Sequence, residues 1–226
     1  MTYNMAKEIW TLIKKEILIE LRMQYALSGM ILYLLSSIFL GYITFSLGRA
    51  PINAATWNVL FWIIMLFVAT NSIAKSFIQE SKEHLLYYYV IANPLSIIIS
   101  KLIFNCLLML FLVLVGFVVY ILLLGNPVED MALFILILVL SSVGFSVTFT
   151  MISSIASKAS NSGTLMAILG FPVIIPILLL LIKISRNAID GLDRTASYDE
   201  ITTISAIIII AISTSILLFP YLWRSN

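Results

Sequence analysis

Charged residues are scarce in this 226-residue chain, where Asp, Glu, Lys and Arg make up 11% and hydrophobic residues 62%. Soluble domains carry about 25% charged and about 45–50% apolar residues. A soluble domain of about 200 residues still exposes roughly 30% of its chain surface, and this composition could not cover that surface with polar groups. The scarcity of charge excludes a soluble fold and predicts an all-α integral membrane protein. The net charge of +2 also excludes the basic patch that nucleic acid requires.

Histidine and cysteine occur once each, as His84 and Cys106. A membrane hydrolase needs a nucleophile with a positioned base, or a metal with several ligands. A single imidazole makes a poor metal or haem ligand set, so we expect His84 to be solvated or to touch a partner protein. Cys106 lies in an apolar run and has no partner for a disulfide. These shortages predict a chain that is not an enzyme and that holds no metal and no firmly bound cofactor.

Phosphate-binding and ion-relay residues are missing as well. The chain contains no G-x-x-x-x-G-K-[ST] loop, so any ATP must be bound by another protein. No Asp, Glu or His falls inside the predicted spans, which argues against an ion-coupled transporter or an intramembrane enzyme.

Six apolar segments have the roughly 20 residues that a helix needs to cross a bilayer. They are residues 26–47, 55–74, 95–124, 131–156, 164–182 and 201–223. Lys and Arg are more frequent on cytoplasmic loops, so their distribution predicts orientation. With the N-terminus inside, nine of them face the cytoplasm and four the outside; the nine are Lys7, Lys14, Lys15, Arg22, Lys75, Lys82, Lys101, Lys158 and Arg224. We therefore expect both termini inside.

Three segments lie between or before the spans. Residues 5–23 place Ile9, Trp10, Ile13, Ile17 and Leu21 at helical spacing, opposite basic residues. That pattern predicts an amphipathic helix in the membrane interface, with Trp10, Lys14, Lys15 and Arg22 as its interfacial residues. The cytoplasmic loop 75–94 carries charges followed by three tyrosines. The outer segment 183–200 is polar, and we expect a short lid or paired half-helices there.

The loop 75–94 permits two interpretations that are compatible with each other. Tyrosines commonly anchor a chain at the membrane interface, where the ring is apolar and the hydroxyl is wet. Alternatively, a short helix projects into the cytoplasm and binds a soluble partner through mixed charge and aromatic rings. The residues for such a contact are Glu80, Lys82, Glu83, His84 and Tyr87.

Two spans carry internal motifs. In segment 131–156, Ser142, Ser146, Thr150 and Ser154 recur every fourth residue and share one helix face. Such residues favour close packing against a neighbouring helix or a second copy of the chain, with a polar substrate path as the alternative.

In segment 164–182, Pro172 and Pro176 each remove a backbone hydrogen bond and bend the helix. The bend permits two interpretations, a hinge whose angle changes and a fixed kink.

The layout resembles the permease subunit of ABC-2-type (type V-like) exporters, and within that group the cytochrome c maturation permease, haem exporter protein B (CcmB). The residues that carry the likeness are Ile17-Glu20-Leu21-Arg22, Glu80-Ser81-Lys82, Leu86-Tyr87-Tyr88-Tyr89, Pro94, Ser100-Lys101, Ser157-Lys158 and Leu169 to Pro176. The likeness runs from about Lys7 to Ser225. One departure is visible, because the family usually has a glycine where this chain has Glu83-His84.

The resemblance implies specific partners and a location. It implies a multi-pass protein of the bacterial cytoplasmic membrane that works with a separate ABC ATPase, haem-handling membrane proteins and a haem chaperone. The loop 75–94 would then be the coupling helix on the ATPase, and two copies of the chain would form a homodimer. ATP would be bound by the partner, and haem would be the cargo, or a haem-loaded chaperone would be released. Two rivals remain, an ABC-2 exporter of a lipid or glycan and a membrane scaffold that transports nothing.

Overall fold

The computed structural model describes residues 5–22, 24–47, 52–73, 93–157 and 162–224, and its regular elements there are helical. The helices are α1 (Met5–Arg22), α2 (Gln24–Leu47), α3 (Ala54–Ser72), α5 (Pro94–Leu124), α6 (Met131–Ala156), α7 (Ser162–Ile189), the 3₁₀ turn η1 (Arg194–Ser197) and α8 (Tyr198–Arg224). Six of them are long and apolar enough to cross a membrane. The predicted all-helical fold with six membrane-spanning helices is confirmed.

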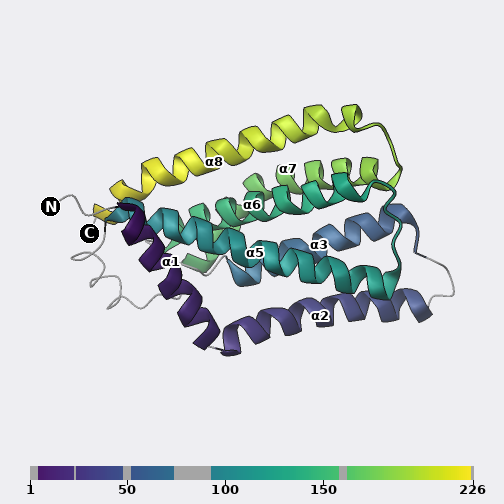
Figure 1. Ribbon diagram of the computed structural model, residues 1–226, viewed down its shortest axis with the longest axis horizontal. Helices are drawn as coiled ribbons and strands as arrows, with labels where there is room; N and C mark the ends of the chain where they lie inside the picture. Colours follow the sequence, from purple (N-terminus) through teal and green to yellow (C-terminus); the bar gives the residue numbers. More distant parts are fainter. Residues whose placement is uncertain (1–4, 23, 48–51, 74–92, 158–161, 225–226) are drawn as a thin grey trace.

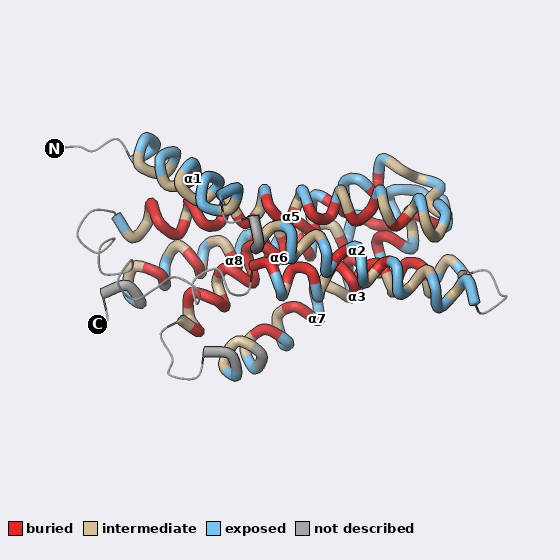
Figure 2. Tube along the Cα trace, turned by 90° about the horizontal axis from the view of Figure 1, so that it is seen from below, coloured by how far each residue is buried: buried red, intermediate tan, exposed pale blue. Residues whose placement is uncertain are grey.

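The six long helices run side by side, and α1 crosses one end of the bundle obliquely (Figure 1). We call this the terminal end, because α1, the start of α5 and the end of α8 meet there. The opposite, far end contains residues 125–130 and 190–197. Tube colouring shows buried residues along the middle of the bundle and exposed ones on its outer faces (Figure 2).

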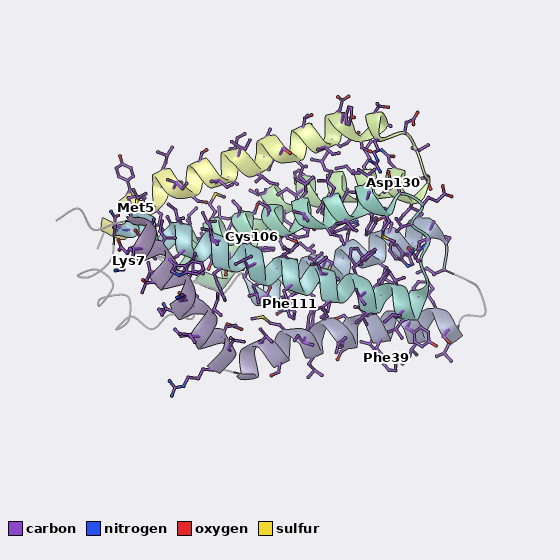
Figure 3. All side chains as sticks on the ribbon, in the orientation of Figure 1. Met5, Lys7, Phe39, Cys106, Phe111 and Asp130 are labelled. Atoms are coloured by element: carbon purple, nitrogen blue, oxygen red, sulfur yellow. The ribbon has the colours of Figure 1, made fainter. Side chains whose placement is uncertain are left out.

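Helix α6 occupies the centre of the bundle and packs against α5, α7 and α8. Large apolar side chains on the perimeter are exposed, such as Phe39 on α2 at 51% and Phe111 on α5 at 47% (Figure 3). In a chain of this composition, such an apolar perimeter faces lipid.

An aromatic cluster fills the half of the bundle nearer the far end. Its members are Trp57, Phe61, Trp62, Phe117, Tyr120 and Phe134, with neighbouring ring centroids 4.8–6.5 Å apart. The indole N–H of Trp57 donates to the carbonyl of Gly125 at 3.1 Å, and the Tyr120 hydroxyl donates to the carbonyl of Trp57 at 2.9 Å. These bonds satisfy the polar tips of large rings that would otherwise be costly to bury.

A polar network joins α3 to α7 beside this cluster. The Ser185 hydroxyl donates to Oδ1 of Asn58 and accepts from the indole of Trp62, both at 2.7 Å. The Asn58 amide donates to the carbonyl of Ile182 at 2.8 Å. Buried polar groups bonded to one another in this way hold two helices in a single register.

The structure differs from expectation in the outer segment 183–200. Helix α7 continues to Ile189, and α8 begins at Tyr198. Ile184, Ser185 and Ala188 are fully buried. The buried face of α7 therefore continues through this segment, although charged residues such as Arg186 are exposed on its other side. A turn at Gly191, whose φ of 63° suits glycine, then reverses the chain. The expected lid or paired half-helices are instead the end of one span, a 3₁₀ turn and the start of the next.

Candidate functional site

The residues predicted to form the coupling loop, Glu80, Lys82, Glu83, His84 and Tyr87, lie outside the described residues. The described chain resumes at Asn93, directly before α5. The Asn93 side chain accepts from the backbone N–H of Leu95 at 3.1 Å, and Pro94 occupies the first position of the helix. Asn at the N-cap followed by Pro is a strong helix start, so α5 begins firmly where the predicted loop ends.

Helix α1 is bonded to this start of α5. The backbone N–H of Asn93 donates to Oε1 of Glu8 at 2.7 Å. This contact joins residues 85 positions apart in the chain. It ties the first turns of α1 to the exit of the predicted loop.

A second contact lies eight residues further along both helices. The Lys101 ammonium is 3.6 Å from Glu16 Oε1, and Lys15 lies 2.8 Å from the same oxygen. The Lys101 side chain is only 4% exposed and that of Glu16 15%. Burial by itself would raise the pKa of Glu16, but the ammonium groups of Lys101 and Lys15 outweigh it and hold the pKa below its ordinary value.

Apolar side chains fill the space between the two polar contacts. Ile13 is 5% exposed, and Leu12 packs against the buried cluster that includes Ile97, Ile98 and Leu102 of α5. Eight residues of helix span about 12 Å, so the contact extends over more than two turns. We call these residues together, Glu8, Leu12, Ile13 and Glu16 on α1 with Asn93, Ile97, Ile98 and Lys101 on α5, the α1–α5 seam.

The sequence pattern of α1 predicted one apolar face, and the structure divides its residues between buried and exposed positions. Of the predicted apolar face, Ile13 is buried, whereas Trp10 and Leu21 are 58% and 61% exposed. Lys14 lies over the Trp10 ring, 5.4 Å from its centroid, and Arg22 is exposed. The amphipathic helix thus has two apolar surfaces, one against the protein and one on its outer side. Placement in the membrane interface stays a prediction.

The roles of Glu16 and Lys101 were missed at the level of sequence. Lys101 was counted among the charges of the cytoplasmic side, and the structure shows it buried in the third turn of α5. A lysine within an apolar run needs a carboxylate partner. Glu16 and Glu20 on the preceding amphipathic helix were the available signal.

The hydroxyl residues of α6 lie in the interior of this one chain. Ser142, Ser146 and Thr150 are fully buried and Ser154 is 4% exposed. Ser142, Ser146, Thr150 and Ser154 donate to carbonyls of their own helix, and Thr150 also accepts from the Asn105 amide of α5 at 2.8 Å. These positions support packing between helices of the same chain, which stays a prediction.

The two prolines of α7 lie within a continuous helix and on its exposed side. Their neighbours on that side, Phe171 and Leu179, are 62% and 60% exposed, so none of the described helices packs over the bend. This location leaves room for α7 to change its angle.

The far end is closed by what we call the Asp130–Arg194 clasp. Arg194 donates to Asp130 through Nε at 2.7 Å and through a terminal nitrogen at 3.0 Å. Asp130 also caps α6 by accepting from the Leu133 N–H at 3.0 Å, and its own N–H donates to Ala188 at 2.9 Å. The hydrogen bond from Arg194, followed by that from Leu133, lowers the pKa of Asp130 to about 2.

The clasp predicts a defined acid sensitivity. A carboxyl whose pKa is lowered on folding stabilises the fold above its unfolded pKa of about 4, and this contribution is lost as the pH falls toward 2. Asp130→Asn should therefore lower the melting temperature at pH 6, and its deficit against the wild type should shrink between pH 4 and pH 2. Thermal unfolding in detergent measures this. Asp193→Asn is the control, because Asp193 makes no side-chain cap bond; a pH-independent Asp130→Asn deficit would contradict the assignment.

Among the described residues, no group of three or more His, Cys, Asp or Glu side chains comes together in a way that could hold a metal ion. At the terminal end, the described polar contacts between helices include those of the α1–α5 seam.

Comparison with protein families assigns this chain to a family. A family model described as CcmB protein matches residues 7–220, from the first turn of α1 to the last turns of α8. A comparison with curated proteins found no match. The matched region contains the seam, all six long helices and the predicted coupling loop. The chain therefore belongs to the CcmB family, the membrane permease components of haem-exporting ABC systems for cytochrome c maturation.

Proposed function

We propose that this chain converts ATP hydrolysis by a separate ATPase into movement of its helices, and so drives haem export or releases a haem-loaded chaperone. The observation that carries the proposal is the α1–α5 seam, which begins at the residue where the predicted coupling loop re-enters the described chain. A force applied to that loop would reach α5 and α1 together.

The proposal places the terminal end in the cytoplasm of a bacterium and the chain in its cytoplasmic membrane. The count of nine Lys and Arg against four supports this orientation. The seam would then lie at the cytoplasmic surface, where a soluble ATPase can bind. The far end, with the Asp130–Arg194 clasp, would face the outside, where haem is attached to c-type cytochromes.

The seam makes the mechanism specific. Glu8 and Glu16 hold two points of α1 to two points of α5, and Ile13 is buried between them. Two helices joined at two separated points move as one body, because rotation about either contact breaks the other. The ATPase must bind one arrangement of this body more tightly than the other, since a partner that binds both equally shifts nothing.

The aromatic cluster and the α3–α7 network would form the fixed part of the bundle, relative to which α1 and the start of α5 move. Hydrogen bonds join α3 to α5 and α7 toward the far end, and the Phe134 ring packs α6 against them, while the prolines of α7 leave the half near the terminal end free to bend. Movement would therefore be largest near the cytoplasm. A homodimer, haem-handling membrane proteins and the chaperone would complete the system.

The α7 prolines provide a prediction. Pro172→Ala restores a backbone N–H opposite the Ile168 carbonyl, and a proline inside a helix costs about 3 kcal/mol. We expect the variant to be at least as stable as the wild type yet to attach less haem to a reporter cytochrome c, because a straighter α7 opposes bending. Pro220→Ala in α8 is the control and should leave haem attachment unchanged. Full activity of Pro172→Ala would favour a fixed kink.

The proposed function as a whole is tested with the partner. The chain is expressed with an ATPase subunit whose catalytic glutamate is replaced by glutamine, so that the complex assembles without hydrolysis. Loss of haem attachment supports energy coupling. Retained haem attachment would favour a scaffold. An exporter of a lipid or glycan would leave haem attachment intact when this chain is deleted.

A further inference from the structure

An open groove of about 580 Å³ lies where the end of α1 meets the start of α2. Its walls are apolar except at Glu20 and Ser28. Leu21 of α1 and Leu27, Ile31, Leu32 and Leu35 of α2 provide the hydrocarbon surface, and Glu20 and Ser28 also line the groove. This volume falls within the range of about 300–1,000 Å³ that is usual for ligand sites.

Glu20 is the unusual member of this groove. Its Oε1 is buried and has no hydrogen-bond partner among the described residues. Burial, and then the neighbouring Glu16 carboxylate, raise the pKa of Glu20. Lys15 and Lys101 pair with Glu16. A buried carboxylate oxygen without a donor is costly and calls for an explanation.

The position of the groove indicates which kind of molecule supplies a hydrogen-bond donor to Glu20. The first candidate span begins at Leu27, so the carboxylate lies at the level where hydrocarbon gives way to headgroups. The apolar lining reaches the outer surface at Leu32 of α2, which is 67% exposed, and Leu18 of α1, one turn before Leu21, is 66% exposed. A ligand that fills this site must have a long apolar part beside a polar cation.

We propose that the groove binds a phospholipid with a primary ammonium headgroup, whose N–H groups donate to Glu20 while an acyl chain lies on the leucine wall of α2. A primary ammonium carries several N–H donors, and a bond between such a group and a carboxylate is charge-assisted and strong. A choline headgroup has no N–H to donate. The negative propionates of haem would be repelled by Glu20. The bound lipid would join α1 to α2 one turn beyond Glu16, the last seam residue on α1, and this role does not depend on coupling to an ATPase.

The test uses the full chain, alone and assembled with its partner proteins, in vesicles of equal phosphatidylethanolamine and phosphatidylcholine. After gentle extraction, native mass spectrometry counts each lipid retained per chain. We expect the wild type to retain the ethanolamine lipid at least fivefold over the choline lipid, both alone and assembled. Glu20→Gln, which keeps the size of the side chain, should reduce this preference to less than twofold, whereas Asp193→Asn at the far end should keep it.

A second variant distinguishes a loss of lipid binding from a loss of the fold. Ile31→Phe narrows the groove and leaves Glu20 in place, so it should reduce the total lipid retained, while size-exclusion chromatography shows an unchanged monodisperse peak. Equal retention of the two lipids by the wild type, or a preference that survives Glu20→Gln, overturns the proposal. Loss of the ethanolamine lipid on assembly overturns it in favour of a basic segment of a partner protein in the groove.

Discussion

Lys101→Met is expected to abolish most haem attachment. Glu16→Gln is expected to destabilise the fold by about 3 kcal/mol, which is the lower end of the range for breaking a buried ion pair. Glu16→Gln removes the carboxylate that lies 3.6 Å from the Lys101 ammonium, whose side chain is only 4% exposed. Lys101→Met removes the buried charge but also the bond that holds α1 to the third turn of α5. Unfolding in detergent measures stability, and covalent haem on a reporter cytochrome c measures function.

Lys14→Met is the matched control for the seam. Lys14 belongs to the same helix, but its ammonium lies over the exposed Trp10 ring, and a surface substitution of this kind changes stability by about 0.5 kcal/mol or less. The exchange Glu16→Lys with Lys101→Glu should recover part of the lost stability and part of the lost haem attachment, because it restores opposite charges across the seam. A Lys101→Met variant as active as Lys14→Met would remove the seam from the mechanism.

Reversing the acidic charges of the predicted coupling loop should have the largest functional effect. Like charges placed against each other at an interface cost several kcal/mol, and each 1.4 kcal/mol weakens binding about tenfold. Glu80→Lys with Glu83→Lys should therefore abolish cytochrome c maturation, while the protein is still inserted in the membrane. Co-purification of the ATPase subunit and haem attachment should fall together.

The control for this reversal is Asp193→Lys, which makes the same kind of charge change in the exposed turn at the far end. It should leave both ATPase binding and haem attachment unchanged. Unchanged haem attachment in the Glu80 and Glu83 variant would refute the coupling role of the loop.

The long helices could be predicted from sequence because the requirement behind them is local. A span needs about 20 apolar residues in a row, and Met131–Ala156, for example, is found at its predicted bounds. The end of α7 was harder to place. Lys183 and Arg186 make residues 183–189 look polar, yet Ile184 and Ala188 are buried on the inward face, and only the packing of the bundle separates the two faces.

The α1–α5 seam could not be derived from sequence, because it depends on how two helices cross. The pattern of α1 grouped Trp10 and Ile13 on one apolar face, but Ile13 is buried and Trp10 is exposed. The carboxylates of Glu8 and Glu16 were counted as charge and not as partners of Asn93 and Lys101. Pairings between residues 85 positions apart follow from the tertiary fold and leave no periodic signal.

The central claim is that a cytoplasmic ATPase engages the segment that precedes the seam, and labelling from each side of the membrane tests it most directly. In a Cys106→Ala background, Ser81→Cys and Asp193→Cys are exposed to a membrane-impermeant maleimide in intact cells and in inverted vesicles. We expect Ser81→Cys to react only in inverted vesicles and to be protected there by the ATPase subunit, and Asp193→Cys to react only in intact cells. Labelling of Ser81→Cys from outside intact cells would contradict the account.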